Sequence, residues 1–109
     1  MADTEYIYRT HDNVIEVELT EEGEPLEQTD YDAITRMTLD FDGTVLDSDV
    51  LGEGDGQPFD WTADARLKLD LGKLSSPIAY GFYRRVKHVV YSPENPHGIV
   101  WGYMAIIVA

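Results

Sequence analysis

Residues 33–50 read AITRMTLDFDGTVLDSDV. Apolar and polar side chains alternate on both sides of Asp42-Gly43, and a period of two is typical of a half-buried strand. Asp-Gly favours a two-residue type I′ turn, because both turn positions need positive φ. We therefore predict a hairpin with strands at Ala33–Phe41 and Thr44–Val50.

The turn also fixes the register of this hairpin. It places Leu39 opposite Leu46 on a mostly apolar face and pairs Arg36 with Asp49 on the polar face. A slip of one residue would exchange the two faces, so the sequence specifies this pairing strongly.

The rest of the chain repeats the strand pattern and has little helical periodicity. Further strands are predicted at Tyr6–Tyr8, Val14–Thr20, Ala65–Leu71, Tyr80–Tyr91 and Ile99–Val108. Connections rich in glycine or proline are predicted at Leu51–Thr62, Gly72–Pro77 and Ser92–Gly98. We predict one domain over residues 1–109, an all-β, antiparallel, immunoglobulin-like β-sandwich of about six to eight strands.

The apolar side chains that share the inward faces of these strands form the predicted core. They are Ile15, Val17, Leu19, Met37, Leu39, Phe41, Leu46, Leu67, Leu69, Leu71, Val86, Val90, Trp101 and Tyr103. Phe59 and Trp61, although they lie in a loop, are expected to pack back onto the sheet.

Composition excludes several classes of function. With 8 Lys and Arg against 21 Asp and Glu, the net charge of −13 disfavours nucleic acid and anionic membranes as partners. The absence of cysteine excludes disulfides and thiol chemistry. We expect no secretion signal, because acids and tyrosines occupy Met1 to Arg9 where an apolar stretch would lie.

Residues 39–48, LDFDGTVLDS, resemble the first motif of the haloacid dehalogenase phosphatases. The resemblance implies a nucleophile at Asp40, a general acid/base at Asp42 and a Mg²⁺ ion. That family has a parallel sheet, whose strands need long, usually helical, crossover connections. No segment of this chain has a convincing amphipathic helix of that length, so we interpret Asp42-Gly43 as a hairpin turn.

The dense acidic residues between Asp40 and Asp55 suggest a calcium site. A calcium-binding loop that begins at Asp47 would place Leu51 and Pro58 where an oxygen ligand and a glutamate are needed. Two alternatives remain for the Gly52–Gly56 loop. It is either an irregular metal- or carbohydrate-binding site or a solvated acidic loop. We predict no cofactor and no metal.

The histidines and basic residues have structural interpretations. His11, His88 and His97 form no metal-ligand pair, and His88 is expected to be partly buried between Val86 and Val90. The basic cluster of Arg84, Arg85, Lys87 and His88 either neutralises carboxylates on a neighbouring strand or meets an acidic surface of an identical subunit.

The last predicted strand is apolar on both faces. Such a strand is either covered on both sides or presents one face to another chain. One alternative is an interface made either by Trp101 and Tyr103 or by Val100, Met104 and Ile106. The other is coverage by the loops around Phe59 and Trp61 within one chain.

Three stretches, LKLDLGKL at 67–74, AYGFY at 79–83 and VVYSPENPHGIVWG at 89–102, carry a second resemblance. They resemble small accessory virion proteins of tailed bacteriophages and prophages, and less closely the immunoglobulin-like N-terminal modules of phage baseplate proteins. The resemblance implies a non-enzymatic docking or assembly protein of the tail, baseplate or head, located in the virion or in the host cytoplasm during assembly. Its implied partners are other virion proteins or copies of itself, in a homo-oligomer.

The residues expected to make these contacts lie in the Ser92–Gly98 connection and on the strands beside it. They are Tyr91, Pro93, Asn95, Pro96, His97, Trp101 and Tyr103. The alternatives are a small metal- or carbohydrate-binding module and, more remotely, the phosphatase. Adaptation to high salt is a further explanation of the acidic composition.

Overall fold

Strands dominate the computed structural model, which describes residues 4–8, 11, 14–61, 65–71 and 78–109. The elements in chain order are β1 (Thr4–Ile7), β2 (Val14–Val17), β3 (Thr20–Glu21), β4 (Glu24–Pro25), α1 (Gln28–Asp32), β5 (Arg36–Phe41), β6 (Thr44–Asp47), α2 (Ser48–Leu51), β7 (Phe59–Asp60), β8 (Leu67–Asp70), β9 (Gly81–Ser92) and β10 (Asn95–Val108). The Gly72–Pro77 turn predicted from the sequence lies outside the described residues.

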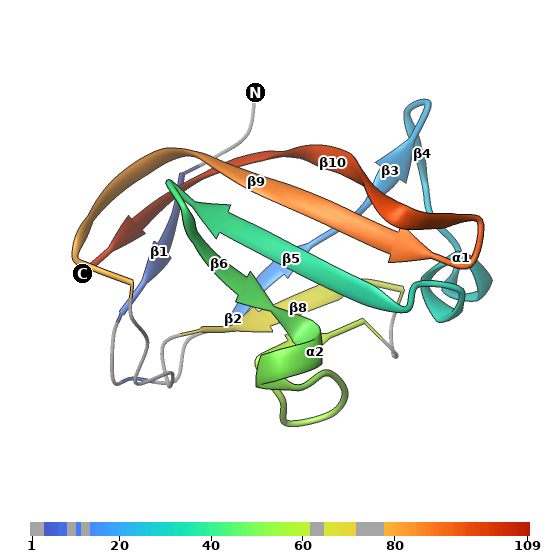
Figure 1. Cartoon of the computed structure of the whole chain (residues 1–109), viewed down its shortest axis with the longest axis horizontal. Helices are drawn as coiled ribbons and strands as arrows, with labels where there is room; N and C mark the ends of the chain where they lie inside the picture. Colours follow the sequence, from blue (N-terminus) through green and yellow to red (C-terminus); the bar gives the residue numbers. More distant parts are fainter. Residues whose placement is uncertain (1–3, 9–10, 12–13, 62–64, 72–77) are drawn as a thin grey trace.

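The strands form two main layers. A five-stranded sheet has the order β1-β10-β9-β5-β6, a three-stranded sheet has the order β2-β8-β7, and β3 and β4 form a small hairpin. In Figure 1, β2 and β8 lie below the large sheet, and the apolar side chains of the two sheets form one core. The predicted all-β sandwich is therefore confirmed.

Two details of the predicted architecture are wrong. The strand β1 pairs with β10 in parallel, so the large sheet is mixed rather than purely antiparallel. The described residues contain ten strands rather than about six to eight, because β3, β4 and β7 are pairings of only two residues each.

The hairpin of β5 and β6 confirms the predicted turn and register. Leu39 faces Leu46, and Asp42 and Gly43 have φ values of 53° and 105°. The second strand ends at Asp47 rather than Val50. The Asp47 carboxylate accepts a hydrogen bond from the backbone N–H of Asp49 and caps α2, which ends the strand.

The predicted Val14–Thr20 strand is also interrupted. It ends at Val17, and Leu19 then turns its backbone toward other partners: its N–H donates to the Tyr31 hydroxyl at 2.9 Å, and its carbonyl accepts from Leu26 N–H at 2.9 Å. Tyr31 belongs to α1, a helix that the sequence analysis did not predict. These bonds hold the β3–β4 hairpin against α1.

Two strands shift their predicted boundaries, and one predicted loop is much shorter. The Ala65–Leu71 strand shortens to β8, and the Tyr80–Tyr91 strand is displaced by one residue as β9. The Ser92–Gly98 loop is replaced by a two-residue turn, because Asn95 already pairs with Ser92. The extra residues of β10 form a bulge that includes Gly98, whose φ is +80°.

Most of the predicted core is confirmed. The buried members are Ile15, Leu19, Met37, Leu39, Phe41, Leu46, Leu67, Leu69, Leu71, Val86 and Val90, whereas Val17 and Trp101 are half-buried against them. Phe59 and Trp61 are buried as expected. Five apolar core residues were not predicted from the sequence: Ile7, Tyr31, Ile78, Ile106 and Val108.

The prediction for Tyr103 is wrong, since this side chain is 47% exposed. A bulge in β10 places one extra residue between Val100 and Gly102. Gly102 therefore pairs with buried His88, and Tyr103 pairs with Lys87 on the outward face. An extra residue reverses the facing of the side chains that follow it.

Tyr31→Phe is expected to lower the free energy of unfolding by about 1–2 kcal/mol. The variant keeps the buried ring but removes the acceptor of the buried Leu19 N–H. Urea denaturation measures the change. Tyr103→Phe, which alters an exposed hydroxyl, should stay within about 0.5 kcal/mol of the wild type. Equal stability of the two variants would contradict the role of the Tyr31 hydroxyl.

Candidate functional site

A groove of about 700 Å³ opens between the β3–β4 hairpin and β10. Its walls come from that hairpin, from α1 and the residues that follow it, from the β9–β10 turn and from the beginning of β10. Figure 1 shows the hairpin projecting beside β10, with α1 near the β9–β10 turn. The groove therefore lies at the end of the sandwich where these four segments meet.

The groove has an apolar floor. Its larger apolar lining residues are Leu26, Ile34, Val90, Ile99, Val100 and Trp101. Ile99 and Val100 remain 41% and 54% exposed, although they lie on a strand beside the core. Exposed branched side chains that line a concavity are typical of a surface that another molecule covers.

The rim of the groove is acidic. It carries the carboxylates of Glu21, Glu22, Asp30 and Glu94, all on exposed residues. Among the described lining residues there is no lysine, arginine or histidine. Negatively charged side chains around a concavity concentrate cations there. The groove therefore favours a ligand that combines positive charge with apolar groups.

Hydrogen bonds fix the walls of the groove. The carboxylate of Asp30 accepts the backbone N–H of Glu27 at 2.9 Å, which closes the first turn of α1. Ile34 N–H donates to the Tyr31 carbonyl, and Thr35 N–H donates to the carbonyl of Tyr91 on β9. The groove is thus formed by paired backbone rather than by an isolated loop.

The structure brings together only some of the contact residues predicted from the sequence. Pro93, Asn95 and Trp101 line the groove, whereas Pro96 and His97 are exposed near the beginning of β10 and do not line it. Tyr91 and Tyr103 lie elsewhere. Arg36 stacks on the Tyr91 ring at 4.6 Å, and Arg85 stacks on the Tyr103 ring at 4.2 Å.

The acidic rim was missed in the sequence analysis. Its carboxylates come from separate parts of the chain, and the run at Glu21 and Glu22 indicated only a strand break. The signal that was present is the concentration of acidic residues around the turn at Glu22-Gly23. Without the topology, nothing placed that turn beside Glu94.

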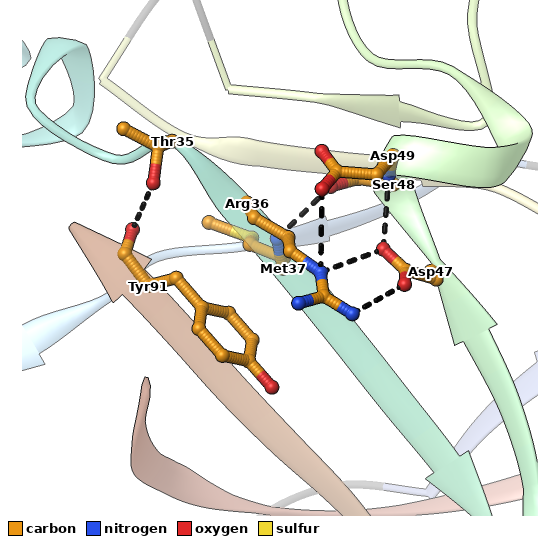
Figure 2. Close-up of polar contacts among 7 residues, drawn as sticks. All are labelled: Thr35, Arg36, Met37, Asp47, Ser48, Asp49 and Tyr91. Atoms are coloured by element: carbon orange, nitrogen blue, oxygen red, sulfur yellow. Dashed lines mark hydrogen bonds and ion pairs between the residues drawn. The ribbon is translucent and has the colours of Figure 1, made fainter. Parts of the chain in front are cut away.

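A polar cluster around Arg36 ties β5 to its neighbours (Figure 2). Arg36 Nε lies 3.0 Å from Asp47 Oδ1 and 3.5 Å from Asp49 Oδ2, and a second nitrogen reaches Asp47 Oδ2. The hydrogen bond from Arg36 lowers the pKa of the Asp47 carboxyl, and Asp47 raises the pKa of Arg36. The predicted Arg36–Asp49 pair is present, but Asp47 is the main partner.

The residues of the phosphatase-like motif form a tight turn. Asp40 Oδ1 accepts the backbone N–H of Gly43 at 2.7 Å. The strand that carries Asp40, β5, has antiparallel neighbours on both sides, β6 and β9. This arrangement differs from the parallel sheet of the haloacid dehalogenase family, and the predicted hairpin accounts for the motif.

The acidic loop after α2 has a fixed backbone. Gly54 N–H donates to the Phe59 carbonyl at 2.8 Å, and a cavity of about 190 Å³ beside the loop is lined by Asp55, Asp60, Lys68 and Asp70, among others. In the described ranges of the chain, no three His, Cys, Asp or Glu side chains are placed to hold a metal ion.

His88 is more deeply buried than the sequence suggested. It is 3% exposed, and its Nε2 lies 3.4 Å from the sulfur of Met37. Burial lowers its pKa to about 4, so the ring is neutral at pH 7. It belongs to the core of the large sheet rather than to the groove.

Comparisons with known proteins return nothing. No family model, no curated protein and no solved structure matches this chain. Within the described part of the chain, neither α1 nor α2 is long or apolar enough to cross a membrane.

Proposed function

We propose that this chain is a non-enzymatic docking module whose groove binds a segment of a protein partner. The segment carries apolar side chains next to lysine or arginine. The observation that carries this proposal is the combination of exposed Ile99 and Val100 with a rim of four carboxylates.

Two physical effects support such a partner. Covering Ile99, Val100 and the half-buried Trp101 removes apolar surface from water, which contributes about 25 cal/mol per Å². The rim carboxylates attract a basic segment and repel an acidic one, so they supply selectivity and speed of association.

We further propose that the docking module belongs to a tailed bacteriophage or prophage, as a component of the tail, baseplate or head. The support is the resemblance of residues 67–74, 79–83 and 89–102 to small accessory virion proteins. The third of these stretches includes Pro93, Asn95 and Trp101, which line the groove.

Fluorescence can test the groove directly. The chain has two tryptophans, so Trp61→Phe leaves Trp101, in the groove, as the single emitter. We expect a blocked hexapeptide of alternating lysine and valine to shift or quench this emission in a saturable manner. A glutamate–valine hexapeptide of the same length should leave the emission unchanged.

A matched pair of variants locates the binding. In the Trp61→Phe background, Glu94→Lys in the rim should weaken binding of the lysine–valine peptide at least about tenfold, because it reverses a charge beside the ligand. Glu53→Lys, an equal change of charge at an exposed position away from the groove, should have little effect. Absence of saturable binding at millimolar peptide would overturn the proposal.

A further inference from the structure

A second charged surface lies on β9 and β10, and we term it the cationic face. It consists of Phe82, Arg84, Arg85 and Tyr103, all of them exposed. The Arg84 guanidinium lies 5.5 Å from the centre of the Phe82 ring, and that of Arg85 lies 4.2 Å from the centre of the Tyr103 ring. Arginine and aromatic side chains are the types most enriched in protein interfaces.

The pairing of the strands explains why these side chains point outward. Phe82 pairs with Ile107, and Tyr103 pairs with Lys87, whereas the intervening Ile106 is buried in the core. A bulge in β9, between the partners of Met104 and Ile106, makes room for both arginines on the exposed surface.

The two arginines of the cationic face and the acidic groove lie toward opposite ends of one long strand. Arg84 and Arg85 belong to the first half of β9, the groove lies at its end beside Ser92, and Tyr103 lies between them on β10. Figure 1 shows the course of both strands. At about 3.3 Å per residue, Arg84 and Ser92 are roughly 25 Å apart. The arginines therefore cannot reach the rim carboxylates of their own molecule.

We propose that a second copy of this chain places its cationic face against the acidic groove of the first. The inference rests on the proposed function of the groove and names the partner. Arginines meet the carboxylates of the rim, and the aromatic rings Phe82 and Tyr103 cover the apolar floor around Val100. The contact joins two different surfaces, so each added copy leaves one groove and one cationic face free.

The net charge of −13 opposes this contact at long range. At a physiological ionic strength of about 0.15 M, the Debye length of about 8 Å screens repulsion between whole molecules. Pairs of opposite charge in direct contact are screened much less. The copies should therefore associate at this ionic strength and separate at very low salt, where repulsion between the molecules dominates.

Two variants and their mixture test the proposal. Sedimentation velocity of the wild type, from micromolar to millimolar protein in about 0.15 M salt, should show association that increases with concentration. Arg85→Glu in the cationic face and Glu94→Lys in the groove should each raise the dissociation constant at least about tenfold. A mixture of the two variants should associate again, because each supplies the surface that the other has lost.

The matched controls are Arg66→Glu and Glu53→Lys, which make the same changes of charge at other exposed positions and should associate like the wild type. A monomeric wild type over the whole range, or a mixture that stays monomeric, would overturn the second copy as partner. Saturable binding of the lysine–valine peptide in that case would leave the docking function standing. If the copies associated but the lysine–valine peptide did not bind, the groove would not be a general docking site.

Discussion

Acidification from pH 7 to pH 4 is expected to destabilise the wild type by about 3 kcal/mol more than the variant His88→Leu. His88 has a pKa of about 4 in the folded protein, against an ordinary value of 6.5. Between these values the unfolded chain binds a proton that the folded chain does not. The stability that depends on a neutral His88 is therefore fully present above pH 6.5 and is lost as the pH decreases toward 4.

The cause is desolvation of the ring by burial. His88 pairs through its backbone with Leu39 and Gly102, and its ring nitrogen lies against the sulfur of Met37. None of these groups stabilises an imidazolium ion, so protonation costs the free energy of placing a charge in the core. One pKa unit corresponds to about 1.4 kcal/mol, which gives the expected size of the effect.

The measurement is the free energy of unfolding in urea at several pH values. Protonation of the many carboxylates changes the stability of all variants alike, so the informative quantity is the difference between wild type and His88→Leu. The exposed His97 provides the matched control, since His97→Leu should keep the pH dependence of the wild type. An identical pH profile for His88→Leu would show that the buried ring does not titrate as stated.

Local sequence signals predicted the parts of the fold that depend on neighbouring residues. The Asp42-Gly43 turn, the Leu39–Leu46 register and the inward leucines of β8 all follow from a period of two and from the φ values that a tight turn requires. These features need no information from distant parts of the chain.

The last strand could not be predicted in the same way. From Ile99 to Val108 both faces are apolar, so alternation does not indicate which side chains point inward. The bulge of β10 between Val100 and Gly102 then reverses which side chains face inward, and a bulge in β9 opposite Met104 and Ile106 shifts the pairing again. The sequence therefore could not tell outward Tyr103 from buried Ile106.

The candidate site is a product of topology. Glu94 is far from Glu21 and Asp30 in the sequence and meets them only because α1 and the β3–β4 hairpin pack beside the β9–β10 turn. A helix of five residues is too short to produce a recognisable period. The Pro93 and Asn95 side of the groove was expected from a resemblance, whereas the acidic side required the structure.

Trp61→Ala is expected to lower the free energy of unfolding by about 3–5 kcal/mol. Trp61 is almost completely buried, and its indole N–H donates to the carbonyl of Ile34 at 3.3 Å. Its own carbonyl lies 3.5 Å from the side-chain nitrogen of Gln28 in α1. Truncation therefore creates a large cavity and leaves the Ile34 carbonyl without its indole donor. A small domain has a total stability of only about 5–15 kcal/mol, so this loss is a large fraction of the whole.

Thermal denaturation followed by circular dichroism measures this loss, with Trp61→Phe and Trp101→Ala for comparison. Trp61→Phe keeps most of the buried volume and should lose less stability than Trp61→Ala. Trp101 is only half-buried, in the groove, so Trp101→Ala should affect stability less and peptide binding more. If Trp101→Ala destabilised the protein more than Trp61→Ala, Trp101 rather than Trp61 would be the core tryptophan. The floor of the groove would then not be available to a partner.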